Sequence, residues 1–186
     1  RRHGLGANRP RHPTDQPMLT DNADTPERPR LPGLLLVEDS RITRTLLSRD
    51  LSKHYTLFDA GDGEEAWTML CDTPAIELVI TDINMPRLTG HQLLVRIRKS
   101  DDARIRQLPV IVMTTADDNV DRNLAFLNGA SDFINKPVDE MELLARTRVH
   151  HKLASIIREL EQSRARLAEL ATTDPLTKLN NRRSFF

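Results

Sequence analysis

Five polar side chains follow short apolar runs in the sequence and could together form one reactive site. They are Glu38 and Asp39 after the first run, Asp82 after the third, Thr114 at the end of the fourth and Lys136 after the fifth. Short, wholly apolar runs are typical of buried strands in parallel sheets. Since ligands bind outside the carboxyl ends of such strands, we expect these side chains to meet at one edge of a sheet.

The residue types at this edge predict a phosphoryl-transfer site that contains a metal ion. Neighbouring carboxylates repel one another, and a hard cation with oxygen ligands, such as Mg²⁺, relieves that repulsion. We expect Glu38 and Asp39 to bind or position the ion, with Asp82 as the third carboxylate. The backbone carbonyl of Asn84 could supply a further oxygen. A carboxylate such as Asp82 can attack a phosphoryl donor, while the metal and Lys136 neutralise the transferring oxygens.

Each of these residues also has an ordinary structural explanation when it is taken alone. An aspartate after a strand is usually a turn residue or a helix cap, and a threonine there usually makes local hydrogen bonds. A lysine before a proline usually lies in an exposed loop. Their joint placement after four of five runs favours a shared site, in which Thr114 would donate its hydroxyl to a phosphoryl oxygen.

The apolar runs alternate with stretches of helical spacing, which predicts a five-stranded, parallel, doubly wound α/β sheet. The expected strands are Leu34–Val37, Tyr55–Asp59, Glu77–Thr81, Val110–Thr114 and Ser131–Ile134. The expected helices between them are Ile42–Lys53, Glu64–Cys71, His91–Lys99 and Asn119–Asn128. Ser40 is a plausible N-cap of the first helix, and Gly129 is a natural residue to end the fourth.

A last helix is expected to begin after the cap Asp139 and to continue to about Leu170, because no proline or glycine interrupts it. Apolar residues recur on it at heptad spacing, with one polar member. This seam consists of Leu153, Ile156, Leu160, Ser163, Leu167 and Leu170. The pattern favours a parallel dimeric coiled coil over 153–171, and the alternative is an amphipathic helix that packs on its own domain.

Two adjacent histidines, His150 and His151, lie early on this helix. Either could be a phosphorelay histidine, but no surroundings typical of a kinase follow in the sequence. We therefore interpret both as exposed helical histidines.

Composition limits the remaining function classes. The 186 residues carry a formal net charge of zero and one cysteine, and 38% of them are hydrophobic. This balance gives no bulk electrostatic argument for nucleic-acid or membrane binding, and a single Cys71 cannot form an internal disulfide. No apolar run approaches the roughly 20 residues of a membrane span, and the N-terminus lacks a signal-peptide core. We expect a soluble, cytoplasmic protein.

The first 32 residues differ from the rest because they hold six of the eleven prolines and few apolar side chains. Such a segment cannot bury enough apolar surface to offset its ordering entropy, so 1–32 is predicted to be a disordered tail. A basic nucleic-acid arm is the alternative. Four interspersed acidic residues weaken it, namely Asp15, Asp21, Asp24 and Glu27.

Four stretches of this sequence resemble the signature motifs of the receiver domains of bacterial two-component response regulators. They are LLLVEDS, ELVITDINMPRLTG, PVIVMTTADD and FINKP. The resemblance covers 33–152 and implies the flavodoxin-like receiver fold. It also implies that Asp82 is the phosphoacceptor, that Glu38 and Asp39 are the acidic pair for Mg²⁺, and that Lys136 contacts the phosphate.

The same resemblance assigns residues to a conformational switch. Thr114 is the switch hydroxyl, and Phe133 stands at the position of the switch aromatic residue. Lys136–Pro137 matches the position at which the family usually has a cis peptide bond. Thr115 replaces the small alanine often found after the switch hydroxyl, and counting back from Lys136 favours Thr114 as the responding residue.

The end of the chain, 172–186, resembles the opening of a GGDEF domain, the fold of diguanylate cyclases. The resemblance rests on the run DPLTKLNNRR from Asp174 to Arg183. It implies that the parent protein makes cyclic di-GMP, whereas this chain lacks the catalytic loop and is not expected to be an enzyme.

Together these motifs predict a signalling switch. A sensor histidine kinase or phosphotransfer protein would phosphorylate Asp82, and a homodimer would form through the receiver face and the long helix. The alternative is a constitutive dimerisation module whose acidic site is not phosphorylated. A DNA-binding regulator would need a helix-turn-helix after the receiver, and the sequence offers none.

Overall fold

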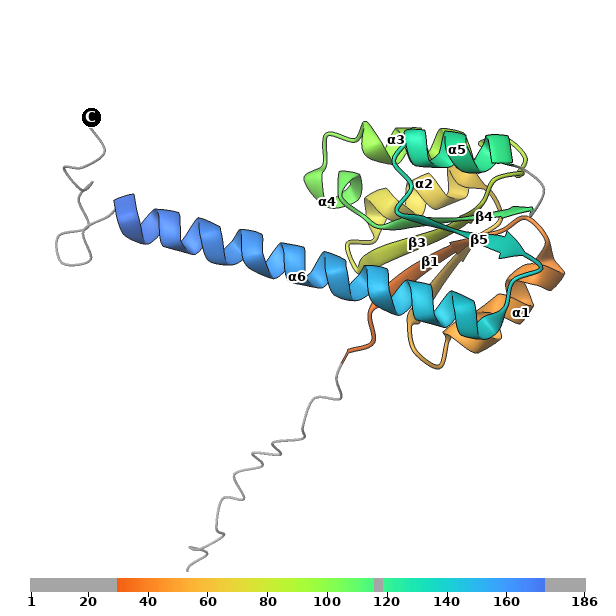
Figure 1. The fold of residues 1–186 in the computed structure, drawn as a ribbon, viewed down its shortest axis with the longest axis horizontal. Helices are drawn as coiled ribbons and strands as arrows, with labels where there is room; N and C mark the ends of the chain where they lie inside the picture. Colours follow the sequence, from red (N-terminus) through yellow and green to blue (C-terminus); the bar gives the residue numbers. More distant parts are fainter. Residues whose placement is uncertain (1–29, 116–118, 173–186) are drawn as a thin grey trace, which may run out of the picture. The chain divides into compact units, whose positions relative to one another are not determined.

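The computed structural model describes residues 30–115 and 119–172, in which five parallel strands form one sheet (Figure 1). The strands are β1 Gly33–Val37, β2 Thr56–Ala60, β3 Ile76–Asp82, β4 Val110–Thr115 and β5 Asp132–Lys136. Their order in the sheet is β2-β1-β3-β4-β5. This is the order of flavodoxin-like doubly wound folds, so the predicted fold class is confirmed.

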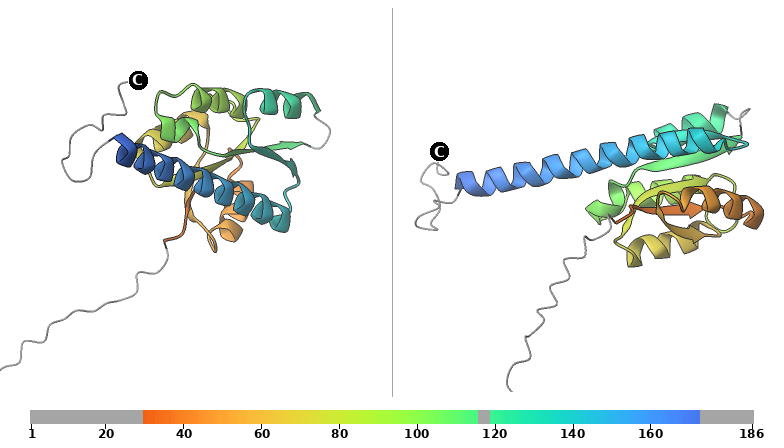
Figure 2. Two further views of the ribbon diagram at one scale, coloured as in Figure 1. Left: turned by 60° about the vertical axis from the view of Figure 1, so that its left-hand side comes forward. Right: turned by 90° about the horizontal axis from the view of Figure 1, so that it is seen from below.

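Helices cover both faces of this sheet (Figures 1 and 2). They are α1 Arg41–Leu51, α2 Gly63–Asp72, α3 Gly90–Arg98, α4 Ala103–Arg106, α5 Asn119–Leu127 and α6 Glu140–Thr172. Buried residues of α1 and α6 pack with one set of strand side chains, and those of α2 to α5 pack with the other set. Two apolar cores therefore lie on opposite faces of a single sheet.

The first strand shows why the sheet forms from these residues. All five residues of β1 are buried, since it lies between β2 and β3 and is covered on both faces. Leu34 and Leu36 belong to one core, and Leu35 and Val37 belong to the other. A continuous apolar run is what a strand buried on both faces requires.

The element ends largely agree with the sequence-based expectations, and strands shift by only one or two residues. The Ser40 hydroxyl accepts a hydrogen bond from the backbone N–H of Thr43 at 3.3 Å, so it caps α1 as expected. Gly129 has a φ of 93°, a left-handed conformation that favours glycine. The four-residue helix α4 was not expected.

Helix α6 is much longer than the other helices and extends past the sheet (Figures 1 and 2). Its first turns are anchored, because Leu143, Leu144 and Thr147 are buried and Asp139 accepts from the backbone N–H of Glu142 at 2.9 Å. None of the described helices is long and apolar enough to cross a membrane. The predicted tail up to residue 29 and the GGDEF-like run from 173 lie outside the described residues.

Candidate functional site

The structure brings the predicted carboxylates together at the carboxyl edge of the sheet. Glu38 and Asp39 directly follow β1, and Asp82 is the last residue of the neighbouring strand β3. Carboxylate oxygens of these three residues all lie within 4.8 Å of one another. Glu38 and Asp82 are buried, whereas Asp39 is exposed. The cluster therefore has a buried base and one open side.

Lys136, the last residue of β5, reaches into this cluster and bridges its two buried carboxylates. Its Nζ lies 2.8 Å from Oδ2 of Asp82 and 2.9 Å from Oε2 of Glu38. Burial by itself would lower the pKa of Lys136, but hydrogen bonds and charge attraction from Asp82 and Glu38 outweigh it, so the pKa is raised. The ammonium group therefore stays charged at neutral pH and holds Asp82 in place.

The donor set fits a hard divalent cation. Three carboxylates share the cluster with one ammonium group, so negative charge remains in excess. Partly buried carboxylates without enough counter-charge are costly, and oxygen-only donors suit Mg²⁺. Asn84 lies two residues after Asp82 and is exposed, in the loop that borders the cluster.

The loop after Asp82 is held tightly against the start of α3. The backbone N–H of Ile83 donates to Oδ1 of Asp82 at 2.8 Å, and that of Gly90 donates to the Ile83 carbonyl at 2.9 Å. A Cβ at position 90 would lie only 2.1 Å from the Asp82 carbonyl oxygen. Glycine is thus required at position 90, because any side chain would push the loop away from Asp82.

An ion pair between an exposed arginine and a buried aspartate, which the sequence did not predict, fixes the other side of this loop. Arg87 has a φ of 64° and forms a salt bridge with Asp62, which is buried. Asp62 also caps α2, accepting from the backbone N–H groups of Glu64 and Glu65 at 2.9 and 3.1 Å. The loop after Asp82 is therefore tied to the α2 terminus. The dipeptide Asp62-Gly63 is typical of a turn, and nothing in the neighbouring sequence indicated that Asp62 would pair with Arg87.

The predicted switch residues lie nearby but do not touch Asp82 through any described hydrogen bond. Thr114 is buried near the end of β4, and its hydroxyl donates to the Thr115 carbonyl at 3.4 Å. Phe133 is partly buried and packs edge-on against Phe126, with ring centroids 5.5 Å apart. The cis peptide bond at Lys136–Pro137 is present.

The interpretation of the two histidines as exposed was wrong. His150 is partly buried, and its Nε2 lies 3.1 Å from Oδ2 of Asp132. His151 is also partly buried, and its Nε2 lies 3.1 Å from Oε2 of Glu77. Helical spacing showed only that they lie on α6. The side on which α6 meets the sheet decides their contacts.

A comparison with models of known protein families finds a match over most of the described chain. The model of the response regulator receiver domain matches residues 34–148, which is more than half of the chain. The chain belongs to the response regulator receiver domain family. Among individual relatives, this receiver domain is 31% identical over 127 residues to the two-component response regulator ORR5 of Oryza sativa subsp. japonica, covering 68% of the chain and 93% of ORR5.

A second relative is much longer than the region it shares with this receiver domain. The response regulator PleD of Caulobacter vibrioides is 33% identical over 134 residues, which are 71% of the chain but only 29% of PleD.

Solved structures resemble the receiver domain as well. The chemotaxis protein CheY4 of Vibrio cholerae superposes with a TM-score of 0.60 at 25% identity, covering 64% of this chain and 98% of CheY4. A probable two-component system response regulator/GGDEF domain protein superposes with a TM-score of 0.61 at 28% identity, covering 66% of this chain and 50% of that one.

Proposed function

We propose that Asp82 accepts a phosphoryl group and that its phosphorylation controls dimerisation through α6. The observation that carries this proposal is the contact of Lys136 with Asp82 inside the three-carboxylate cluster. A purely structural role for Asp82 would not require a second buried carboxylate, Glu38, and an exposed one, Asp39, beside it. Membership in a family that acts in two-component signalling supports the same function.

The proposed step follows from the positions of these groups. An oxygen of the Asp82 carboxylate attacks phosphorus, a P–O bond forms, and the bond between phosphorus and the donor breaks. The donor leaves with the electron pair and takes up a proton from solvent. Lys136, released from its ion pair with the Asp82 carboxylate, then binds a phosphoryl oxygen.

A magnesium ion would complete this site. Glu38, Asp39, Asp82 and the backbone carbonyl of Asn84 are the proposed ligands, and the ion supplies positive charge for the transferring phosphoryl oxygens. Without added charge, the carboxylates would repel an incoming phosphate.

Thr114 and Phe133 are proposed to pass the change in charge to the surface. The Thr114 hydroxyl is bound only weakly, to a carbonyl at 3.4 Å, so a phosphoryl oxygen offers it a stronger acceptor. Phe133 lies between Arg122, whose guanidinium carbon is 4.6 Å from the ring centroid, and Phe126. A new Phe133 position would alter this face near α5.

The proposed phosphoryl donors are a sensor histidine kinase or a phosphotransfer protein. One solved relative is a signal receiver domain of a signal transduction histidine kinase from Syntrophus aciditrophicus. In a phosphohistidine donor, the bond that breaks is the P–N bond, and the leaving group is a neutral imidazole once it is protonated.

The proposed output is a parallel coiled coil of two α6 helices. The seam residues Leu153, Ile156, Leu160 and Leu167 are all half exposed or more, so this apolar face has no cover within the described chain. The GGDEF-like run at the chain end and the GGDEF relative support a cyclase as the domain controlled in the parent protein. The resulting product would be cyclic di-GMP.

A constitutive dimer is the second candidate, because the exposed seam could associate without phosphorylation. Light scattering of the 186-residue chain, with Mg²⁺ and with or without beryllofluoride, separates the two. The switch predicts a dimer fraction that rises with beryllofluoride in the wild type and stays constant in Asp82→Asn. An equal dimer fraction under all conditions would establish the constitutive module instead.

A further inference from the structure

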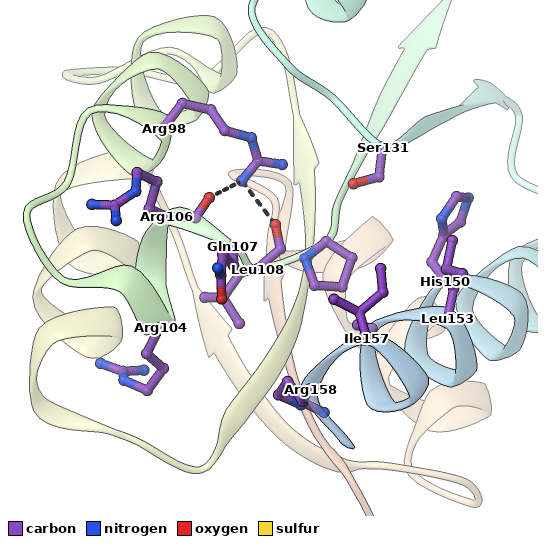
Figure 3. A pocket seen from close by; sticks show the side chains of 12 residues that line it. Arg98, Arg104, Arg106, Gln107, Leu108, Ser131, His150, Leu153, Ile157 and Arg158 are labelled. Atoms are coloured by element: carbon purple, nitrogen blue, oxygen red, sulfur yellow. Dashed lines mark hydrogen bonds between the residues drawn. The ribbon is translucent and has the colours of Figure 1, made fainter. Parts of the chain in front are cut away.

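A second concave region lies at the opposite end of the strands from Asp82. It is a groove of about 680 Å³ between α6 and the segment that leads from α4 into β4 (Figure 3). Pro109 and Ser131, which line it, directly precede β4 and β5 and so mark the amino ends of the strands. Pockets of roughly 300–1,000 Å³ are the usual size for small organic ligands.

The charged side chains that line this groove are basic, but three of them already contact carboxylates. Arg104 pairs with Asp102 at 3.4 Å, Arg158 with Glu77 at 2.7 Å and His150 with Asp132 at 3.1 Å. Four arginines and one histidine contribute to the lining, whereas aspartate and glutamate do not. The arginines are Arg98, Arg104, Arg106 and Arg158. Arg98 and Arg106 have no salt bridge within the described chain, and their positive charge favours an anionic ligand.

Arg98 is a partly buried cation in the lining of this groove. It donates to three backbone carbonyls, those of Gly129, Arg106 and Leu108, at 2.9, 2.9 and 2.8 Å. No carboxylate within the described chain forms a salt bridge with it, and burial lowers the pKa of its guanidinium. Its Nη2 has no hydrogen-bond partner among the described residues, so one donor of the fork is available.

Ser131 provides a second donor in the lining of the same groove. Its Oγ accepts from the backbone N–H of Val110 at 3.1 Å, and in the described structure its own hydrogen has no acceptor. Figure 3 shows the Ser131 hydroxyl and the Arg98 guanidinium pointing toward one another across the groove. A guanidinium N–H beside an O–H is a suitable pair for a carboxylate.

The side of the groove formed by α6 is apolar. Leu153 and Ile157 project from α6 into it and keep 51% and 47% of their surface exposed. Pro109 and Leu108 form the facing wall. Polar donors at one end and an uncovered apolar wall beside them match a molecule that has a charged head and an apolar body.

We propose that this groove binds a small amphipathic carboxylate. The carboxylate accepts hydrogen bonds from Arg98 and Ser131, and the apolar chain covers Leu153 and Ile157. Such a ligand contacts α6 and the receiver body at once, so it holds the output helix against the body. Asp82 does not line the groove, so binding does not require its phosphorylation.

Titration of the isotope-labelled 186-residue chain with decanoate, below its micelle concentration, tests the proposal by NMR. Saturable shift changes are expected at Arg98, Ser131, Leu153 and Ile157, and decanol is expected to bind about tenfold more weakly because it lacks the charge. Equal affinity for decanol, or shifts that do not saturate, would overturn the proposal.

Two matched variants locate the site. Ile157→Glu places a carboxylate in the groove and should weaken decanoate binding by about tenfold or more. Val149→Glu is the control, since Val149 is exposed on α6, at 63%, but neither lines the groove nor belongs to the seam. Equal affinities for the two variants would refute the assignment. Asp82→Asn should bind decanoate as the wild type does, so failure here is separable from failure of the phosphorylation proposal.

Discussion

At the scale of single residues, the site depends on how Lys136 balances two buried acids. Its Nζ lies within 2.9 Å of both Asp82 and Glu38, and neither acid is reached by another described basic side chain within 4.0 Å. Removing one partner of such a group leaves uncompensated buried charge. Lys136 should therefore matter for the chemistry of Asp82 as well as for its position.

We expect Lys136→Ala to slow phosphoryl incorporation from acetyl phosphate by about 100-fold, because a positive charge on the transferring oxygens is lost. The rate of phosphoprotein formation under saturating Mg²⁺ measures this effect. Lys99→Ala removes an exposed lysine far along the sequence from the site and serves as the control. An unchanged rate in Lys136→Ala would contradict the proposed role.

Asp132 gives a pH-dependent prediction. Burial alone would raise its pKa, but hydrogen bonds from Arg146, the Phe133 backbone and His150 outweigh that effect and lower the pKa below 3.8. The stabilisation is therefore complete above the ordinary pKa and is lost as pH falls through the lowered value. Urea unfolding between about pH 5 and pH 2 should show that the free energy of unfolding falls more steeply for the wild type than for Asp132→Asn. An equal fall in the free energy of unfolding of the two proteins would contradict this contribution of Asp132.

At the scale of elements, close packing between β3 and α3 fixes where Asp82 lies. Gly90→Ala would place a Cβ 2.1 Å from the Asp82 carbonyl oxygen, whereas at Gly61 the nearest atoms are side-chain atoms at 3.4 Å. We expect Gly90→Ala to cost about 1–3 kcal/mol of unfolding free energy, and Gly61→Ala to change it by about 0.5 kcal/mol or less. Chemical denaturation measures both. Similar values for the two variants would mean that the loop relaxes freely.

The elements also show what the sequence could and could not predict. Continuous apolar runs identified the buried strands, and the order of polar residues after them predicted that Glu38, Asp82 and Lys136 would meet. Helix α4 has four residues, too few to show a helical period. The Asp62–Arg87 pair and the histidine contacts of α6 depend on how separate elements pack, and neighbouring residues in sequence carry no such information.

At the scale of the whole molecule, α6 connects the receiver body to whatever follows it. Leu160 is 58% exposed on the predicted seam. Leu160→Glu should abolish dimerisation under beryllofluoride and leave the thermal unfolding of the monomer nearly unchanged, since a charge at the core of a coiled coil is strongly unfavourable. Ala165→Glu, off the seam and also exposed, is the control. Light scattering measures the dimer, and calorimetry measures the thermal unfolding. If Leu160→Glu still dimerised, the dimer interface would have to lie outside this seam.

Phosphorylation of Asp82 is the central claim, and site-resolved mass spectrometry of the acetyl phosphate-treated chain tests it most directly. In the presence of Mg²⁺ we predict one phosphoryl group on the peptide that contains Asp82. None should form in Asp82→Asn or after chelation of the metal. Phosphate on another residue, or equal incorporation in Asp82→Asn, would contradict the account.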